Sequence, residues 1–277
     1  MEKPKILFAF QEIYPYLKET QMSKVGRFLP QGIQERGKEI RTFMPRYGCI
    51  NERRNQLHEV IRLSGMNLII DDTDHPLIIK VASIQSARMQ VYFIDNDDYF
   101  SSKKFIMVDD KNIAFTDNDE RTIFFCRGII ETVKKLQWMP DIIHANGFIA
   151  SLLPLYLKGV LRDNPFFSDT KVIYTVYDDD YCGCFNKDVE AKLKMDGIRK
   201  QDLDKYKNTD FISINKAAID YADAITIGSP NINPELMEYI DSIRSTKPVL
   251  DLHSEEDYIE AYSEFYDEIL VNASVAV

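Results

Sequence analysis

Residues 6–10 read Ile-Leu-Phe-Ala-Phe, an apolar run typical of a strand that is buried on both faces of a parallel sheet. A helix is predicted from about Met22 to Gln34, and Arg36-Gly37 fits its C-terminal end. Its apolar residues recur at helical spacing, at Val25, Phe28, Leu29 and Ile33. Residues Glu39 to Met44 return to strand character. This order predicts a βαβ unit with a right-handed crossover.

The same alternation continues along the chain. Strands are predicted at Val91–Ile94, Ile142–Ile143, Lys171–Val176 and Ala224–Ile227, and helices at Ile123–Leu136 and Ala150–Gly159. Repeated strand–helix units indicate an α/β fold, with a Rossmann-like, doubly wound and mostly parallel sheet. In such a sheet, binding groups are expected in the loops beyond the carboxyl ends of the strands.

Two stretches interrupt the alternation. Residues Glu59 to Ala87 are interpreted as extra strands or a hairpin, and Asp188 to Asp210 as a charged helical insertion. A C-terminal helix is predicted from a cap at Ser254 to Leu270. It carries an aromatic stripe that we expect to pack on the domain, at Tyr258, Tyr262, Phe265, Tyr266 and Ile269. Because no linker rich in Gly or Ser separates these segments, we interpret residues 1–277 as one domain.

Composition narrows the class of protein. The chain has 277 residues, 45% of them hydrophobic, which is enough to build a real core. Its formal net charge of −10 disfavours nucleic acid and anionic membrane surfaces as partners. No apolar run approaches the ~20 residues that span a bilayer, and no signal-peptide core follows the first residues, so we expect a cytoplasmic protein. The four cysteines lack zinc-ligand spacing and are expected to be free thiols.

Familiar cofactor motifs are absent, among them Gly-x-Gly-x-x-Gly and the Walker lysine loop, and we expect neither a cofactor nor a metal. Polar residues do follow the predicted strands and are expected to converge on one cleft: Gln11, Glu12 and Lys18, then His144 and Asn146, then Tyr177 to Asp180. His144 is either a general base, for which no orienting partner is visible, or a satisfied histidine at a strand end. Asp178-Asp179-Asp180 could hold Mg²⁺, but a solvated acidic loop is favoured.

A family resemblance rests on a series of motifs in order over about residues 3 to 235. They are Lys5-Ile6-Leu7-Phe8, Arg36-Gly37-Lys38, Met44-Pro45-Arg46-Tyr47-Gly48, Pro140-Asp141-Ile142-Ile143-His144, and Tyr221-Ala222-Asp223-Ala224 to Ser229-Pro230. The series resembles the N-terminal half of bacterial glycogen synthases and plant starch synthases. The resemblance implies one lobe of the GT-B arrangement. It also implies transfer of glucose from ADP-glucose or UDP-glucose to a glucan without a catalytic metal.

The site motifs depart from that family. Its Lys-Thr-Gly-Gly-Leu loop reads Lys18-Glu19-Thr20-Gln21-Met22 here, and its next aspartate is Lys24. Its His-x-His-Asp-Trp-His reads His144-Ala145-Asn146-Gly147-Phe148-Ile149, and its His-Asn reads Tyr177-Asp178. The resemblance implies ligand-binding positions at Lys18, Thr20, Gln21, His144, Asn146, Tyr177 and Asp178. No catalytic residue is assigned.

These departures predict negligible autonomous glucosyl transfer, because losing one preorganised donor typically costs ~10²-fold or more in rate. We expect a binding or regulatory subunit of α-glucan metabolism, with an α-glucan or nucleotide sugar as ligand. The alternatives are a half-enzyme completed by a second chain and a repurposed small-molecule binder. A further hypothesis places an excised second domain between about Ser242 and Pro248, with residues 248–270 as its returning strand and helix. The face exposed by that loss is expected to be polarised or covered by a second copy.

Overall fold

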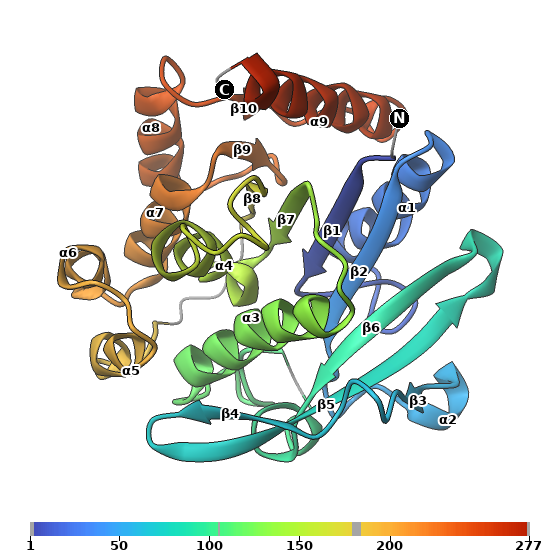
Figure 1. The fold of residues 1–277 in the computed structure, drawn as a ribbon, viewed down its shortest axis with the longest axis vertical. Helices are drawn as coiled ribbons and strands as arrows, with labels where there is room; N and C mark the ends of the chain where they lie inside the picture. The colour runs from blue at the N-terminus through green and yellow to red at the C-terminus, as the bar shows by residue number, and fades with distance from the viewer. Residues whose placement is uncertain (1–2, 105, 179–183, 276–277) are drawn as a thin grey trace.

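A computed structural model describes residues 3–104, 106–178 and 184–275 (Figure 1). Its strands are β1 (Lys5–Phe10), β2 (Glu39–Pro45), β3 (His58–Glu59), β4 (Met66–Ile70), β5 (Thr73–Ile84), β6 (Met89–Asp95), β7 (Ile142–Asn146), β8 (Lys171–Val176), β9 (Ala224–Ile227) and β10 (Val249–Leu250). Its α-helices are α1 (Gln21–Glu35), α2 (Glu52–Asn55), α3 (Asn118–Lys135), α4 (Leu153–Leu155), α5 (Val189–Met195), α6 (Lys200–Leu203), α7 (Phe211–Tyr221), α8 (Pro234–Ile243) and α9 (Tyr258–Val275). Short 3₁₀ or π turns are η1 (Gln85–Ala87), η2 (Asp97–Ser101), η3 (Phe148–Ala150), η4 (Tyr156–Val160) and η5 (Asp204–Tyr206).

The described strands form a sheet in the order β10-β9-β8-β7-β1-β2-β6-β5-β3, with β4 paired to β5. Strands β10 to β6 along this path pair in parallel, while β5 runs antiparallel to β6, β3 and β4. Strand β1 lies at the centre, between β2 and β7. The chain moves outward from β1 in both directions, so the predicted doubly wound, mostly parallel sheet is confirmed.

Helices cover both faces of the sheet (Figure 1). Helix α1 packs against β1, β2 and α9, while α3 packs against β4 and β6, and α4 and α7 pack against β8. Residues Ile6 to Phe10 of β1 are 0% exposed, as expected for a strand covered on both sides. The predicted hairpin within residues 59–87 is also confirmed as β4 and β5.

Two predicted helices differ from the structure. The single helix expected at Ala150–Gly159 is divided into η3, α4 and η4, because Pro154 fits only the first turn of a helix and starts a new one there. Helix α9 begins at Tyr258 rather than directly after Ser254. The Ser254 Oγ instead accepts a hydrogen bond from the Asp257 amide in a preceding turn.

Helix α9 crosses the domain beside α1 (Figure 1). Its aromatic stripe faces inward as expected. Tyr262, Phe265 and Tyr266 are buried. A Cβ at Gly32 of α1 would lie 2.3 Å from Ile259 Cγ2, so only glycine permits this close approach of the two helices. The docked position of α9 is therefore encoded on both helices.

Two expectations from composition can be compared with the structure of the described residues. Cys49, Cys126 and Cys184 are free thiols, and Cys182 lies outside the described part of the chain. No helix within the described ranges is long and apolar enough to cross a membrane. The interpretation of the chain as one domain stays a prediction.

Candidate functional site

The loop between β1 and α1, together with the first residue of α1, holds three of the predicted ligand-binding residues. Thr20 caps α1: its Oγ1 accepts a 3.0 Å hydrogen bond from the Ser23 amide and donates one to Glu12. Burial raises the pKa of Glu12, and the Thr20 hydrogen bond offsets part of that rise. Lys18, Thr20 and Gln21 are exposed at this end of the sheet. The loop therefore presents side chains where the resemblance implies glycine.

His144 lies on β7 in the interior and is 0% exposed. Its Nε2 lies 2.6 Å from Thr175 Oγ1 on β8, and its Nδ1 lies 2.8 Å from the Tyr266 hydroxyl on α9. Burial lowers the pKa of His144 to about 3 from its ordinary 6.5, so the imidazole is neutral at neutral pH. This arrangement matches the satisfied histidine at a strand end, and its partners come from distant segments. Ligand contact by His144 stays a prediction.

The crevice beyond β1 and β7 is closed by side chains. The Tyr177 hydroxyl donates to Asn146 Oδ1 at 3.3 Å, and the Tyr47 hydroxyl donates to the Gln11 carbonyl at 3.1 Å. Gln11, Asn146 and Tyr177 are buried. Doubly wound folds bind ligands at this switch point, between strands whose connections leave in opposite directions. Here protein atoms occupy it.

Asp178 is exposed where the described chain stops after β8. Asp179 and Asp180, which belong to the magnesium hypothesis, lie outside the described residues, as does Cys182. Of the predicted residues, the structure brings His144, Asn146 and Tyr177 into one buried cluster, while Gln21 and Tyr177 line one cavity. Lys18, Thr20 and Asp178 stay outside that cavity.

That cavity, which we call the α1–α9 pocket, has a volume of about 370 Å³ and opens beside the ends of β8 and β9. It is lined on the α1 side by Gln21, Lys24, Val25 and Phe28, at its floor by Tyr177 and Gly228, and opposite by residues between 252 and 262. Phe28, expected on the core-facing side of its helix, is 45% exposed. It faces the gap between α1 and α9 rather than the sheet, which the helical spacing alone does not show.

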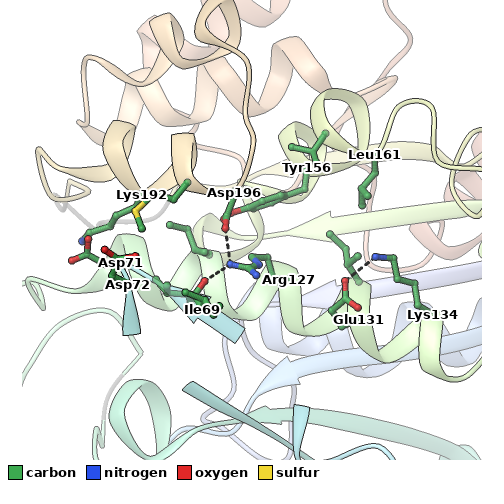
Figure 2. Close-up of a pocket in the computed structure, with 15 residues that line it drawn as sticks. Ile69, Asp71, Asp72, Arg127, Glu131, Lys134, Tyr156, Leu161, Lys192 and Asp196 are labelled. Carbon is green, nitrogen blue, oxygen red and sulfur yellow. Dashed lines mark hydrogen bonds and ion pairs between the residues drawn. The ribbon is translucent and has the colours of Figure 1, made fainter. Parts of the chain in front are cut away.

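A larger cavity of about 510 Å³, the α3 groove, lies between α3, the β4–β5 hairpin and α5 (Figure 2). Two pairs of its charged side chains form ion pairs within the groove. Arg127 Nη1 lies 2.6 Å from Asp196 Oδ1 and donates to the Ile69 carbonyl, while Lys134 pairs with Glu131 at 2.8 Å (Figure 2). None of the predicted ligand-binding residues lines this groove. We therefore place the candidate site at the α1–α9 pocket.

The sequence did not reveal one wall of that pocket. Leu252, His253, Glu255 and Tyr258 lie far along the chain from the strand-end motifs. The only available signal was the aromatic stripe of the last helix, which was interpreted as a packing surface. Tyr262 and Tyr266 do pack against His144, with ring centroids 5.5 and 5.8 Å away.

Comparisons with known proteins agree on the fold. A family model described as the starch synthase catalytic domain matches residues 5–245. A glycogen synthase of Chlorobium limicola is 34% identical over 234 residues, covering 81% of this chain and 45% of the relative. A glycogen synthase of Chlorobium phaeovibrioides is 32% identical over 241 residues, covering 84% and 47%. The chain spans about half the length of these curated relatives.

A solved structure shows the same architecture. The catalytic domain of Starch Synthase IV from Arabidopsis thaliana, bound to ADP and acarbose, has a TM-score of 0.68 with this chain at 16% identity. The match covers 93% of this chain and 53% of that one. At this identity the match supports the fold alone.

Proposed function

Because the chain belongs to the starch synthase catalytic domain family, we propose that it acts in α-glucan metabolism as a binding or regulatory subunit without independent glucosyltransferase activity. The expected ligand is an α-glucan or a nucleotide sugar, and the expected location is the cytoplasm. The related Arabidopsis catalytic domain was solved with ADP and acarbose, which supports this ligand class.

The observation that carries the proposal is the closed crevice beyond β1 and β7. His144 and Ile149 are 0% exposed, so neither presents a group to a sugar at the surface. The imidazole of His144 is also neutral and has a hydroxyl near each ring nitrogen. Transition-state stabilisation needs donors aimed at the reacting atoms, and these side chains are turned to structural contacts instead.

A half-enzyme completed in trans is the second candidate. Its support is that the match covers 45–47% of the glycogen synthase relatives. Under this proposal, another chain carries the matching lobe. The docked helix α9 supports the related proposal that a second domain was excised between about Ser242 and Pro248. A second copy of the chain is the other expected partner.

Two assays on the purified protein separate these functions. Co-sedimentation with glycogen, and no release of ADP from ADP-glucose with or without cell extract, supports a binding subunit. Release of ADP only when extract from a strain lacking its own glycogen synthase is added supports the half-enzyme. A protein that stays in the supernatant and never releases ADP overturns both, and leaves the repurposed small-molecule binder suggested by the α1–α9 pocket.

A further inference from the structure

We propose that the α3 groove binds an amphipathic helix of a partner protein, with apolar side chains along one face of that helix and Lys or Arg residues at one of its ends. The groove lies outside the site of the proposed function, since none of the predicted ligand-binding residues lines it. The occupant is therefore a protein segment, whereas the proposed ligand is a glucan or a nucleotide sugar.

Exposed apolar side chains line the groove from three elements around α3. Ile69 on β4 is 57% exposed, Met195 at the end of α5 is 50% exposed, and Val160 on η4 is 41% exposed. Ile123 and Ile130 of α3 also line the groove and are nearly buried, so they extend its apolar surface inward. Large apolar side chains that gather on one exposed surface are typical of a protein interaction site.

The groove is long enough for a helix. Its α3 residues run from Ile123 to Lys134, so it extends about 16 Å along that helix at 1.5 Å per residue. Asp71 and Asp72 lie at one end of the groove and Leu161 lies at the other (Figure 2). About three turns of a partner helix cover this distance, and its side chains at i, i+4 and i+7 lie on the face that meets the groove.

One end of the groove carries unbalanced negative charge. Asp71 and Asp72 are exposed, and neither carboxylate pairs with another residue in the described part of the chain. Lys192 lies at the same end, but its ammonium already binds Asp119 at 2.8 Å and Glu120 at 2.5 Å (Figure 2). A partner with Lys or Arg at this end is attracted, whereas an acidic partner or a phosphate is repelled.

The two aspartates occupy a turn that does not itself require charge. They connect β4 to β5, and both have left-handed backbone conformation, with φ angles of 48° and 60°. Two-residue hairpin turns with positive φ favour Asn-Gly or Asp-Gly. A second aspartate in place of glycine adds repulsion between neighbouring carboxylates, and a cationic partner relieves that repulsion.

The edge of β4 favours a helix over an added strand. An extended partner would pair its backbone with the free edge of β4, which pairs only with β5 among the described strands. The carbonyl of Ile69 already accepts a hydrogen bond from Arg127 Nη1 at 2.5 Å, and the same guanidinium pairs with Asp196 at 2.6 Å. An added strand would have to displace this guanidinium. A helix satisfies its own backbone hydrogen bonds and contacts the groove through side chains alone.

A display selection on the full chain tests the groove. The probe is a library of random peptides about 12–15 residues long, enough for three helical turns, and the affinities of enriched peptides are measured by fluorescence anisotropy. Enriched peptides should carry Lys or Arg at one end and apolar residues at helical spacing, and should gain helical circular dichroism on binding. Raising the salt concentration should weaken their binding, because it screens the attraction to the exposed carboxylates.

A first pair of double variants tests the charged end of the groove. Asp71→Asn with Asp72→Asn removes both charges, while asparagine still tolerates the positive φ of the turn, and should weaken binding roughly three- to tenfold. The matched control, Glu238→Gln with Glu256→Gln, removes two exposed carboxylates outside the groove and should leave the affinity unchanged. The control separates a local contact from the change in net charge.

A second pair tests the apolar surface. Ile69→Thr keeps a β-branched side chain on the strand and Met195→Gln keeps an unbranched one on the helix, and together they should weaken binding roughly tenfold. The matched control, Ile61→Thr with Met139→Gln, changes residues that are 83% and 53% exposed outside the groove and should not alter the affinity. Thermal melting checks that each variant folds.

Three results of the selection overturn the proposal: enrichment of no peptide, a consensus without basic residues, or peptides that bind the wild type and both groove variants equally well. Light scattering tests the other occupant. A wild-type dimer that becomes monomeric in the apolar groove variant, but not in its control, identifies a second copy in the groove and also overturns the partner helix. Co-sedimentation with glycogen should be the same for every variant, since none of the substituted residues lines the α1–α9 pocket, so the proposed function stands or fails separately.

Discussion

His144 should contribute to the loss of stability of the folded chain on acidification. Its pKa is 6.5 when exposed and about 3 when folded. Because folding lowers the pKa of His144, the unfolded state binds a proton below pH 6.5 that the folded state does not bind. The contribution of His144 to the free energy of unfolding is therefore fully present above pH 6.5 and is lost as the pH falls toward 3. At 1.36 kcal/mol per unit, the loss from this group between pH 7 and pH 5 is about 2 kcal/mol.

Urea unfolding of the wild type and of His144→Gln at pH 7, 6 and 5 measures this effect. The glutamine amide can form hydrogen bonds with the Thr175 and Tyr266 hydroxyls but does not titrate. Carboxylates with raised pKa, such as Asp119 and Asp196, are common to both proteins and cancel in the comparison. The wild type should lose about 2 kcal/mol more than the variant between pH 7 and pH 5.

A second readout is independent of the variant's folding. In proton NMR of the wild type, the histidine C2 signal that shows contact with the Tyr266 ring should not shift between pH 7 and pH 5. Equal pH dependence of wild type and variant, or titration of that signal near pH 6.5, would refute the sealed and neutral imidazole.

Three substitutions test the other contacts, each by urea unfolding at pH 7. Gly32→Ala should cost about 1–3 kcal/mol by pushing α9 from α1, and adding Ile259→Ala should restore part of the loss; an undiminished loss in the double variant contradicts direct contact. Lys38→Met removes two 3.0 Å hydrogen bonds from a buried ammonium to α9 and should cost about 1–2 kcal/mol, whereas an unchanged midpoint would mean that these bonds are not formed in solution. Tyr156→Phe removes the hydrogen bond to one oxygen of the mostly buried Asp196 carboxylate, whose other oxygen pairs with Arg127. The variant should lose about 1–3 kcal/mol of unfolding free energy. An unchanged free energy of unfolding would show that water replaces the phenol.

Much of the fold could be predicted from local sequence. Strands β8 and β9 begin and end at the predicted residues, because β-branched runs between turn residues leave little ambiguity. The division of the segment after β7 was missed, although Pro154 was visible, because its apolar periodicity continues through the break. Periodicity reports which residues are apolar and not where a helix restarts.

The site could be predicted only in part. Strand-end reasoning found Tyr177, since the carboxyl ends of parallel strands meet at one edge of the sheet, whereas Gln21 came from the family resemblance. It did not find the partners of His144, because Tyr266 is 122 residues away and reaches it only through the docking of α9. Exposure of Phe28 likewise depends on the gap between two helices and not on its own helix.

Incubating the purified chain with ADP-glucose and maltoheptaose, and following chain length by mass spectrometry, tests the central claim most directly. We predict that the maltoheptaose peak stays unchanged at protein concentrations where an ordinary synthase, turning over at about 1–10³ s⁻¹, would extend it within minutes. Appearance of longer maltooligosaccharides at such a rate, from protein free of contaminating synthase, would contradict the claim that this lobe has no independent glucosyltransferase activity.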